Sequence, residues 1–329
     1  MKLSSKTLIA TSLTIVSLFL FFLYFLGYPN ENIAATRSVE KETHFLIPKP
    51  KEKSKLVFSI LKTGEAKTLE AFVIEGGSVL KVVTVAHSGF YVQHPKGNFL
   101  FDTGLGTKIK EQFQIFPLYL KLLMDYQLIQ TASGQLESNG IKTDSIQDVF
   151  FSHLHWDHAS GLKDFPSAKI HSLPGELNNP KIELGYISSQ FDGDSVNWNH
   201  LQFHNIPYAS YPKSLDWFGD GTAVFVPMKG HSEGSVGLFL HTENRETFFF
   251  TGDIVWRKEG FLNKKHKPRG ARWIVDYDTT TLGEEISRVH ELIKVNPELQ
   301  VIPAHDHDVQ GALGFYPKLI GGSRSTVMR

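Results

Sequence analysis

The stretch His153-Leu154-His155-Trp156-Asp157-His158 decides the fold, because four of its six side chains are of the kind that binds metal ions. Neutral imidazole and carboxylate are the ligand types that divalent metals, above all zinc, prefer. The stretch directly follows the apolar run 148–152. A polar loop that happens to be rich in histidine is the alternative, but ligand groups at this spacing after a buried strand favour a metal site. The rest of the chain should then supply the missing ligands.

The composition limits the classes of protein to which the chain can belong. Its 329 residues, with 41% hydrophobic and 21% charged, fit one large globular domain or two modest ones. The 34 basic residues balance 34 acidic ones, so no net positive charge attracts nucleic acid. There is no cysteine, which excludes disulfides, thiolate ligands and a cysteine nucleophile. Any metal must therefore be held by nitrogen and oxygen.

The amino-terminal segment Thr7–Tyr28 carries no charge over 22 residues and follows Lys2 and Lys6. As a helix it would be about 33 Å long, enough to cross the hydrocarbon layer. We therefore predict a membrane anchor, with the lysines in the cytoplasm and the folded part on the extracytoplasmic, periplasmic side. A signal peptide cleaved near Ile33-Ala34-Ala35, which would release a secreted protein, is the alternative.

Domain boundaries follow from the same pattern. Residues 1–29 are the predicted anchor or signal segment, and the polar, proline-containing residues 30–55 read as a linker. An ordered first strand reached by a short tether is the alternative for part of that linker. Residues 56–329 form the predicted catalytic domain.

Short β-rich segments separated by Gly and Pro turns precede the metal motif and predict an antiparallel sheet. They are Leu56–Leu61, Leu69–Ile74, Val79–Ala86, Gly89–Gln93 and Phe99–Phe101. Asp102, at the end of the last segment, is either a turn former or a group that orients a ligand imidazole. Leu105–Thr131 has helical apolar spacing and is expected to break into two helices at Pro117. Its apolar stripe is expected to pack in the core, with a lid over the site as the minor alternative.

Three later strands each end in a loop that carries a ligand-type residue. The strands Ala223–Pro227, Thr247–Phe250 and Gln300–Ile302 lead to His231, Asp253 and His305. One histidine or aspartate after a strand is commonly a turn or a cap. Three of them, all following a ligand-rich stretch, form a constellation that predicts a metal centre. Ser152, Thr251 and His307 are expected to be structural or to support ligands.

The four motifs His-x-His-x-Asp-His, Gly-His-Ser-x-Gly-Ser, Thr-Gly-Asp and Ala-His resemble those of the metallo-β-lactamase superfamily. Within it, they are most similar to the N-acyl-homoserine lactonases and related lactone and ester hydrolases. The resemblance implies an α/β fold, a four-layer αββα sandwich with two metals in a cleft. It also implies His153, His155 and His231 as ligands of the first metal. Asp157, His158 and His305 would bind the second metal, and Asp253 would bridge the two.

The expected mechanism is attack of a metal-bridging hydroxide on the substrate, since two zinc ions lower the pKa of a shared water from about 15.7 towards 7. Asp157 and Asp253 are the expected catalytic carboxylates, with Asp253 holding and shuttling the proton. The lactonases carry a tyrosine three residues after the bridging aspartate, whereas this chain has Trp256 there. Another hydroxyl would have to replace it.

The substrate class is less determined. The leading prediction is a dinuclear zinc hydrolase of lactones or carboxylic esters with a small-molecule substrate. Phosphodiester or phospholipid cleavage is the alternative, motivated by the basic stretch Arg257–Arg272. The default interpretation of that stretch is a solvent-exposed loop without a binding role. An iron oxidoreductase on the same scaffold and a non-catalytic binding protein are weaker alternatives. The aromatic stretch Phe191–Phe218 either walls a substrate pocket or packs on the core as a hairpin.

Overall fold

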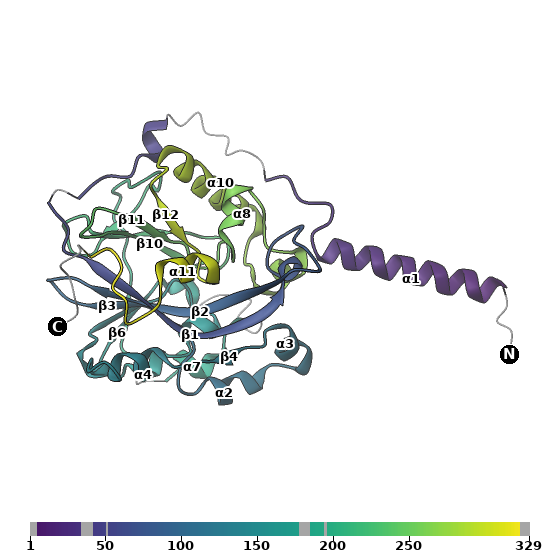
Figure 1. Cartoon of the computed structure of the whole chain (residues 1–329), viewed down its shortest axis with the longest axis horizontal. Helices are drawn as coiled ribbons and strands as arrows, with labels where there is room; N and C mark the ends of the chain where they lie inside the picture. The colour runs from purple at the N-terminus through teal and green to yellow at the C-terminus, as the bar shows by residue number, and fades with distance from the viewer. Residues whose placement is uncertain (1–4, 34–41, 51, 178–184, 194–195, 323–329) are drawn as a thin grey trace.

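Two β-sheets lie face to face in the computed structural model, which describes residues 5–33, 42–50, 52–177, 185–193 and 196–322 (Figure 1). Within these residues the first sheet has seven strands in the order β4-β1-β2-β3-β5-β6-β7, and the second has five in the order β12-β11-β10-β9-β8. Both sheets are mixed, because β3, β5, β6 and β7 pair in parallel, as do β11 and β12, while the other pairs are antiparallel.

The first sheet contains β1 Val57–Leu69, β2 Val82–Gln93, β3 Phe99–Thr103, β4 Gln127–Leu128, β5 Asp148–Phe150, β6 Lys169–Ser172 and β7 Trp198–His200. The second contains β8 Leu215–Asp216, β9 Ala223–Pro227, β10 Val236–His241, β11 Thr247–Phe250 and β12 Gln300–Ile302. The helices are α1 Ser5–Phe25, α2 Ile109–Gln112, α3 Leu118–Leu123, α4 Ala132–Glu137, α5 Trp156–Ala159, α7 Ser188–Phe191, α8 Lys258–Leu262, α9 Arg269–Val275, α10 Thr279–Val295 and α11 His307–Leu313.

Three clusters of buried apolar side chains lie between successive layers of the fold. Between the sheets, Phe58 and Phe101 of the first sheet meet Phe225 and Phe250 of the second. Outside the second sheet, α10 contributes one cluster, and outside the first sheet α4 and α5 contribute another. Burial of these side chains provides the main driving force for stacking the layers. The order helix, sheet, sheet, helix agrees with the predicted αββα sandwich.

The helix α10 spans Thr279–Val295 and covers the second sheet. Its buried residues recur at a spacing of three or four, as in Leu282, Ile286 and Val289, so that one face packs on the second sheet. At its amino end the Asp278 side chain accepts a hydrogen bond from the backbone N–H of Thr281. Such a cap stabilises a helix by about 1 kcal/mol.

The first strands are longer than predicted. Leu56–Leu61 is the start of the continuous strand β1, and a single strand, β2, covers both Gly89–Gln93 and most of the segment before it. Leu69–Ile74 is not a separate strand, because Glu70–Phe72 forms a 3-10 turn. The Glu70 carboxylate closes this turn by accepting hydrogen bonds from the Ser78 backbone and from Lys81.

The segment after β3 breaks at Pro117 as predicted, since Pro117 is the N-cap residue of α3. The resulting helices α2 and α3 are short, and the segment ends in the two-residue strand β4. Phe113 and Leu120 are buried, whereas Leu118 and Leu122 are 71% and 73% exposed. The predicted core stripe is therefore only half buried.

The helix α1 projects from the globular body (Figure 1). In the described part of the chain, no helix is long and apolar enough to cross a membrane, so the predicted membrane-spanning segment is not supported. Lys2 and the predicted cleavage site at Ala34-Ala35 lie outside the described residues. The carboxyl end of α1 rests on α9, where the Arg269 guanidinium lies 4.2 Å from the Tyr24 ring centre.

Candidate metal centre

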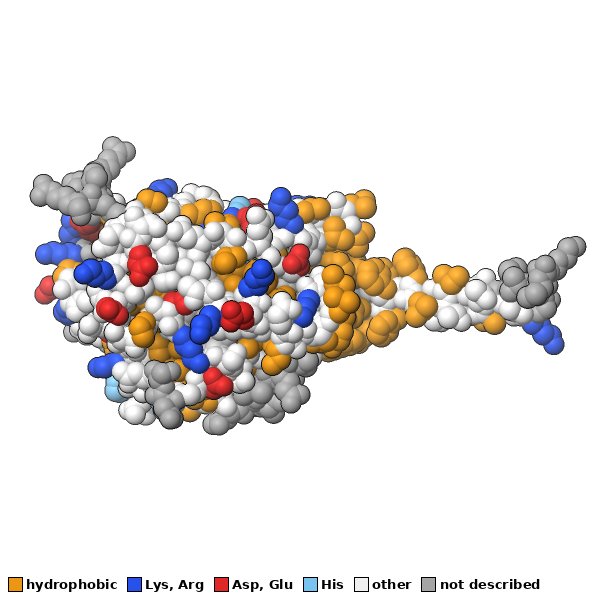
Figure 2. Space-filling model, turned by 90° about the horizontal axis from the view of Figure 1, so that it is seen from below, with side chains coloured by type: hydrophobic (Ala, Val, Ile, Leu, Met, Phe, Trp, Pro, Cys, Tyr) orange, Lys and Arg blue, Asp and Glu red, His pale blue; other side chains and the backbone are white. Residues whose placement is uncertain are grey.

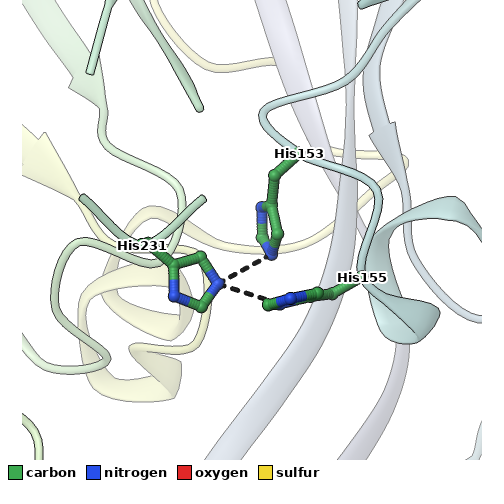
Figure 3. Close-up of side chains that lie close together, drawn as sticks. All are labelled: His153, His155 and His231. Atoms are coloured by element: carbon green, nitrogen blue, oxygen red, sulfur yellow. Dashed lines mark hydrogen bonds between the residues drawn. The ribbon is translucent and has the colours of Figure 1, made fainter. Parts of the chain in front are cut away.

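Three buried imidazoles from two loops converge on one point (Figure 3). His153 and His155 follow β5, and His231 lies in the loop between β9 and β10. The Nε2 atom of His231 lies 3.0 Å from Nε2 of His153 and 2.9 Å from Nδ1 of His155. The strands β5 and β9 end at the same edge of the sandwich, and this brings loops from both sheets together.

Protonation explains why these contacts are not ordinary hydrogen bonds. Burial, together with the neighbouring imidazoles, holds the pKa of His153 and His155 well below its usual range, so both rings are neutral. The Nδ1–H of His231 donates to Oδ1 of Asp276 at 2.7 Å, which leaves a lone pair on its Nε2. Lone pairs that face one another repel unless a cation lies among them.

The remaining ligand-type residues form a second group beside the first. Oδ2 of Asp253 lies 3.1 Å from Nε2 of His305, and Oδ1 of Asp253 lies 3.3 Å from Nε2 of His158. Oδ2 of Asp157 lies 3.3 Å from Nε2 of His305. Asp253 is also 3.7 Å from Nε2 of His231, so it lies between the two groups. All seven residues predicted from the sequence are buried and come together here.

Hydrogen-bond partners on the outer side of His158 and His305 fix the orientation of these two rings. Nδ1 of His158 donates to Oδ2 of Asp102 at 2.9 Å, and Nδ1 of His305 donates to the Ala86 carbonyl at 2.7 Å. In both rings this directs Nε2 towards the centre. Asp102 therefore orients a ligand imidazole, which was one of its two predicted roles. Its φ of 57° is unusual for a residue other than glycine.

The donor set fits divalent cations. Burial opposes the charged form of every group, but the carboxylates Asp102, Asp253 and Asp157 outweigh it and raise the pKa of His158 well above its usual range. Burial likewise opposes ionisation of Asp253, yet His305 and His158 hold its pKa well below its usual range. This buried cluster of carboxylates thus requires positive charge, which divalent metals held by these residues would supply. Oδ1 of Asp253 and Nε2 of His158 are buried without a hydrogen-bond partner.

Four residues at the site were missed by sequence reasoning. Asp276 accepts from His231, and the fully buried Lys267 lies 2.5 Å from Oδ1 of Asp276 and donates to the Asp253 carbonyl at 2.5 Å. Glu176 is buried and accepts hydrogen bonds from the backbone of Leu154 and from Ser232, so it ties the two ligand loops together. His87 lies on β2, 3.0 Å from Asp157. None of the four belongs to a motif, since each lies in an ordinary strand, turn or helix end.

Trp256 occupies the place of the expected tyrosine and is bound to the centre. Its indole Nε1–H donates to Oδ2 of Asp253 at 2.9 Å. Indole is a donor only, so it can hold this carboxylate but cannot exchange a proton as a phenol would.

A cavity of about 270 Å³ leads to the ligands. Its inner end holds His87, His155, His231, Asp253 and His305, and its outer part is lined by Phe25, Leu122, Leu123, Met124, Ile274 and Val275. The cavity is therefore polar at its base and largely apolar in its outer part, where Lys67, Thr68 and Asp125 are the polar lining residues. This combination is typical of small-molecule sites.

The aromatic stretch does not line this cavity. Tyr208 and Tyr211 are buried in the cluster under α10, and Trp217 packs against the cluster between the sheets. In the part of this stretch that the structure describes, core packing is thus the correct one of the two alternatives. Residues 194 and 195 lie outside the described part.

The basic stretch is not a solvated loop. Arg257 pairs with Asp308 at 2.9 Å, and Arg269 and Arg272 both pair with Glu31, at 2.7 and 2.8 Å. The three arginine side chains, like Lys267, are buried. These cations serve internal ion pairs, which weakens the argument for an anionic substrate.

Comparison with known proteins gives consistent matches. A family model described as "Metallo-beta-lactamase superfamily" matches residues 82–305. The chain is similar to a "Probable metallo-hydrolase" of Mycobacterium tuberculosis, with 26% identity over 234 residues, covering 66% of this chain and 74% of the relative. It is 26% identical over 185 residues to N-acyl homoserine lactonase AttM of Rhizobium radiobacter, covering 53% of this chain and 67% of that protein.

A solved structure shares the fold. It is an N-acyl homoserine lactone hydrolase with the product N-hexanoyl-L-homoserine bound at its catalytic metal center. The TM-score is 0.63 at 18% sequence identity, over 82% of this chain and 100% of that one. At this level of identity the match concerns the fold alone.

Proposed function

The chain belongs to the metallo-beta-lactamase superfamily and is a metal-dependent hydrolase, and from this premise we propose that it hydrolyses lactones or carboxylic esters with two zinc ions. The observation that carries the proposal is the placement of Asp253 between two sets of ligands, with carboxylate oxygens 3.1 Å from His305 and 3.7 Å from His231. A carboxylate in that position suits a bridge between two metals. Nitrogen and oxygen donors without thiolate suit zinc.

Two zinc ions, when bound, acidify a water and polarise the scissile carbonyl. The residues of the chain prepare the site for this chemistry. His153, His155 and His231 would hold one ion, and Asp157, His158 and His305 the other. Asp253 would join them as a carboxylate, and Trp256 holds its Oδ2 in place by donating the indole N–H. Asp102 and Asp276 keep ligand rings in the correct tautomer from behind.

The walls of the cavity support a substrate with an apolar chain. Leu122, Leu123 and Ile274 line the outer part, together with the exposed side chain of Lys67. An acyl group would pack against these walls while its lactone or ester carbonyl reaches the ligands. The lactonase relative and the protein in the product-bound structure are both named as enzymes that hydrolyse N-acyl homoserine lactones, which agrees with this substrate class.

Phosphodiester cleavage is the second candidate but has less support, because Arg257, Lys267, Arg269 and Arg272 are engaged in ion pairs. An iron oxidoreductase would use the same scaffold with a different metal. Both alternatives are separated from the leading proposal by experiment.

We also propose a location at a membrane surface on the extracytoplasmic side, with residues 56–329 as the catalytic domain and residues 1–29 as the segment that brings it there. Hydrophobic side chains gather where α1 leaves the body and continue along α1 (Figure 2). Phe19 and Phe21 on α1 are 58% and 57% exposed. Such surfaces mark sites of contact with membranes or proteins. Co-flotation of the full chain with lipid vesicles tests this location, and a protein that stays in the aqueous fraction contradicts it.

The catalytic proposal is tested by metal removal and reconstitution with a substrate panel. Chelated protein is titrated with zinc and assayed on an N-acyl lactone, an aryl carboxylic ester and an aryl phosphodiester. We expect lactone or ester turnover to disappear on chelation and to return at two zinc ions per chain. Full activity without metal would contradict the proposal. Turnover of the phosphodiester alone, or iron with a redox-active spectrum and no hydrolysis, would favour an alternative.

A further inference from the structure

His87 belongs to the metal centre although no motif contains it. It lies within β2, on the face that looks into the cavity, and is 5% exposed. Its Nδ1 lies 3.0 Å from Oδ2 of Asp157. Its ring centre is 5.3 Å from that of His305. Two residues proposed as ligands of the second metal are thus its immediate neighbours.

By distance, His87 forms a group with Asp157 and His305, whereas His158 belongs to a different group. The ligand atoms of His87, Asp157 and His305 all lie within 4.8 Å of one another. His158 forms the corresponding group with His153 and Asp253 instead. Asp157 and His305 are proposed ligands of the second metal, and the ligand atom of His87 lies beside theirs. We therefore propose that the His87 imidazole is a direct ligand of the second metal, bound through Nδ1.

The contact between His87 and Asp157 has the same character as the contacts in the first group. There, ligand nitrogens approach to 2.9 and 3.0 Å. Metal–nitrogen bonds of 2.0–2.1 Å in a tetrahedral site place ligand atoms about 3.3 Å apart. A nitrogen and an oxygen at 3.0 Å are therefore close to the separation that one shared ion requires.

The hydrogen bonding of His87 leads to the same assignment. Its Nε2 is buried and has no partner in the described structure. If Nδ1 carried the proton and donated to Asp157, the Nε2 lone pair would remain unsatisfied at the inner end of the cavity. If Nε2 carries the proton, the Nδ1 lone pair faces a carboxylate oxygen, and a cation between the two satisfies both. Because Nε2 has no protein partner in either tautomer, its surroundings do not oppose this assignment.

The assignment rests on the proposed two-metal centre and changes its composition. The second metal would have His87, His158 and His305 together with Asp157 and the shared Asp253. Such a set supplies more protein ligands than a four-coordinate zinc site holds. A competing role is purely orienting, in which His87 holds Asp157 by a hydrogen bond and never touches the metal.

Metal binding to the full chain separates the two roles. Wild type, His87→Asn and His87→Ala are compared for zinc content after dialysis, for affinity by competition with a chelator, and for the visible absorption of bound Co²⁺. An asparagine amide can replace the hydrogen bond from Nδ1 to Asp157, but it is a poor metal ligand. His200→Ala, which removes an exposed imidazole far from the motifs, is the matched control.

We expect wild type and His200→Ala to bind two zinc ions. Both His87 variants should keep the first ion, which reports a folded centre, and bind the second at least about 100-fold more weakly, beyond the 10–100-fold range of supporting residues. The Co²⁺ absorption of the second site should change in both. If His87→Asn binds the second ion like wild type, the orienting role holds and the proposal is wrong. A wild type that binds one ion would refute the dinuclear centre itself, and this assignment with it.

Discussion

The two ends of the cavity are built on opposite principles. At the base, four of the proposed ligand rings are held from behind by a second residue, such as Asp102 behind His158 and Asp276 behind His231. At the entrance, Leu122 is 73% exposed and is held only by the short helix on which it lies. A metal centre needs ligands fixed to a fraction of an ångström, whereas an apolar wall needs only area. Substitutions at the base should therefore act on metal binding and rate, and those at the entrance on substrate choice.

The largest loss of activity and of bound metal is expected from substitution of Asp253, which lies between the two groups of proposed ligands. Asp253→Ala removes the carboxylate that lies between His231 and His305 and leaves their rings without a common partner. We expect kcat/KM to fall at least about a thousandfold and metal content to fall below two ions per chain. His231→Ala should behave similarly. Elemental analysis and kinetics measure both, and activity within tenfold of wild type would show that Asp253 is not a bridge.

A smaller loss of zinc affinity is expected from substitution of a residue that supports a proposed ligand without being one. Asp276→Asn keeps the shape of the side chain but removes the charge that faces His231 and the buried Lys267. We expect zinc affinity at the first site to fall about 10–100-fold, because supporting carboxylates fix the tautomer of a ligand and raise its basicity. Chelator competition measures this. Unchanged affinity, with a lower thermal midpoint, would assign Asp276 to stability alone.

The contrast between the two ends also explains what the sequence could predict. The base consists of motifs, because ligands must follow strand ends and lie in loops with glycine. Spacing and strand context alone therefore predicted a cluster of His153, Asp253 and His305, and the structure brings these side chains together. The strands β9, β11 and β12 have the predicted bounds, since each is a clear apolar run.

The missed features lack such a local pattern. His87 lies inside a strand and Asp276 in a turn after α9, and their importance appears only when distant segments meet. For the same reason the sequence left open whether the aromatic stretch Phe191–Phe218 walls the pocket or packs in the core. Tyr208 and Tyr211 pack under α10, while Leu122, in a stripe that is typical of a core, lines the entrance. A sequence pattern gives the periodicity of an apolar face but not the partner that covers it.

At the entrance, Leu122→Gln tests whether the apolar wall selects substrates. Leu118→Gln is a matched control, because Leu118 lies on the same helix with 71% exposure but does not line the cavity. We expect Leu122→Gln to lower kcat/KM several-fold for a long acyl chain, equivalent to about 1–2 kcal/mol of lost apolar contact, and to leave a short chain unchanged. A fall of equal size for both chain lengths, or the same fall in Leu118→Gln, would contradict a chain-binding role.

The smallest effect is expected where the amino-terminal segment joins the entrance. Hydrogen bonds from Arg272 and then Arg269 outweigh burial and lower the pKa of Glu31 to about 2. Because this folded-state pKa lies below the ordinary value of 4.5, the ion pairs stabilise the protein above pH 4.5 and lose their effect as the pH falls from 4.5 towards 2.

Glu31→Gln should therefore lower the thermal midpoint only slightly at pH 7, by about 2 °C or less, since Glu31 is 39% exposed and solvent screens the pairs. The difference from wild type should shrink below pH 4.5 and with added salt. Metal content and the rate with a short-chain substrate should not change, because Glu31 touches α9 and not the ligands. A difference that stays constant from pH 7 to pH 3 would show that the ion pairs contribute nothing. A loss of metal would show that the two ends of the cavity are coupled through α9.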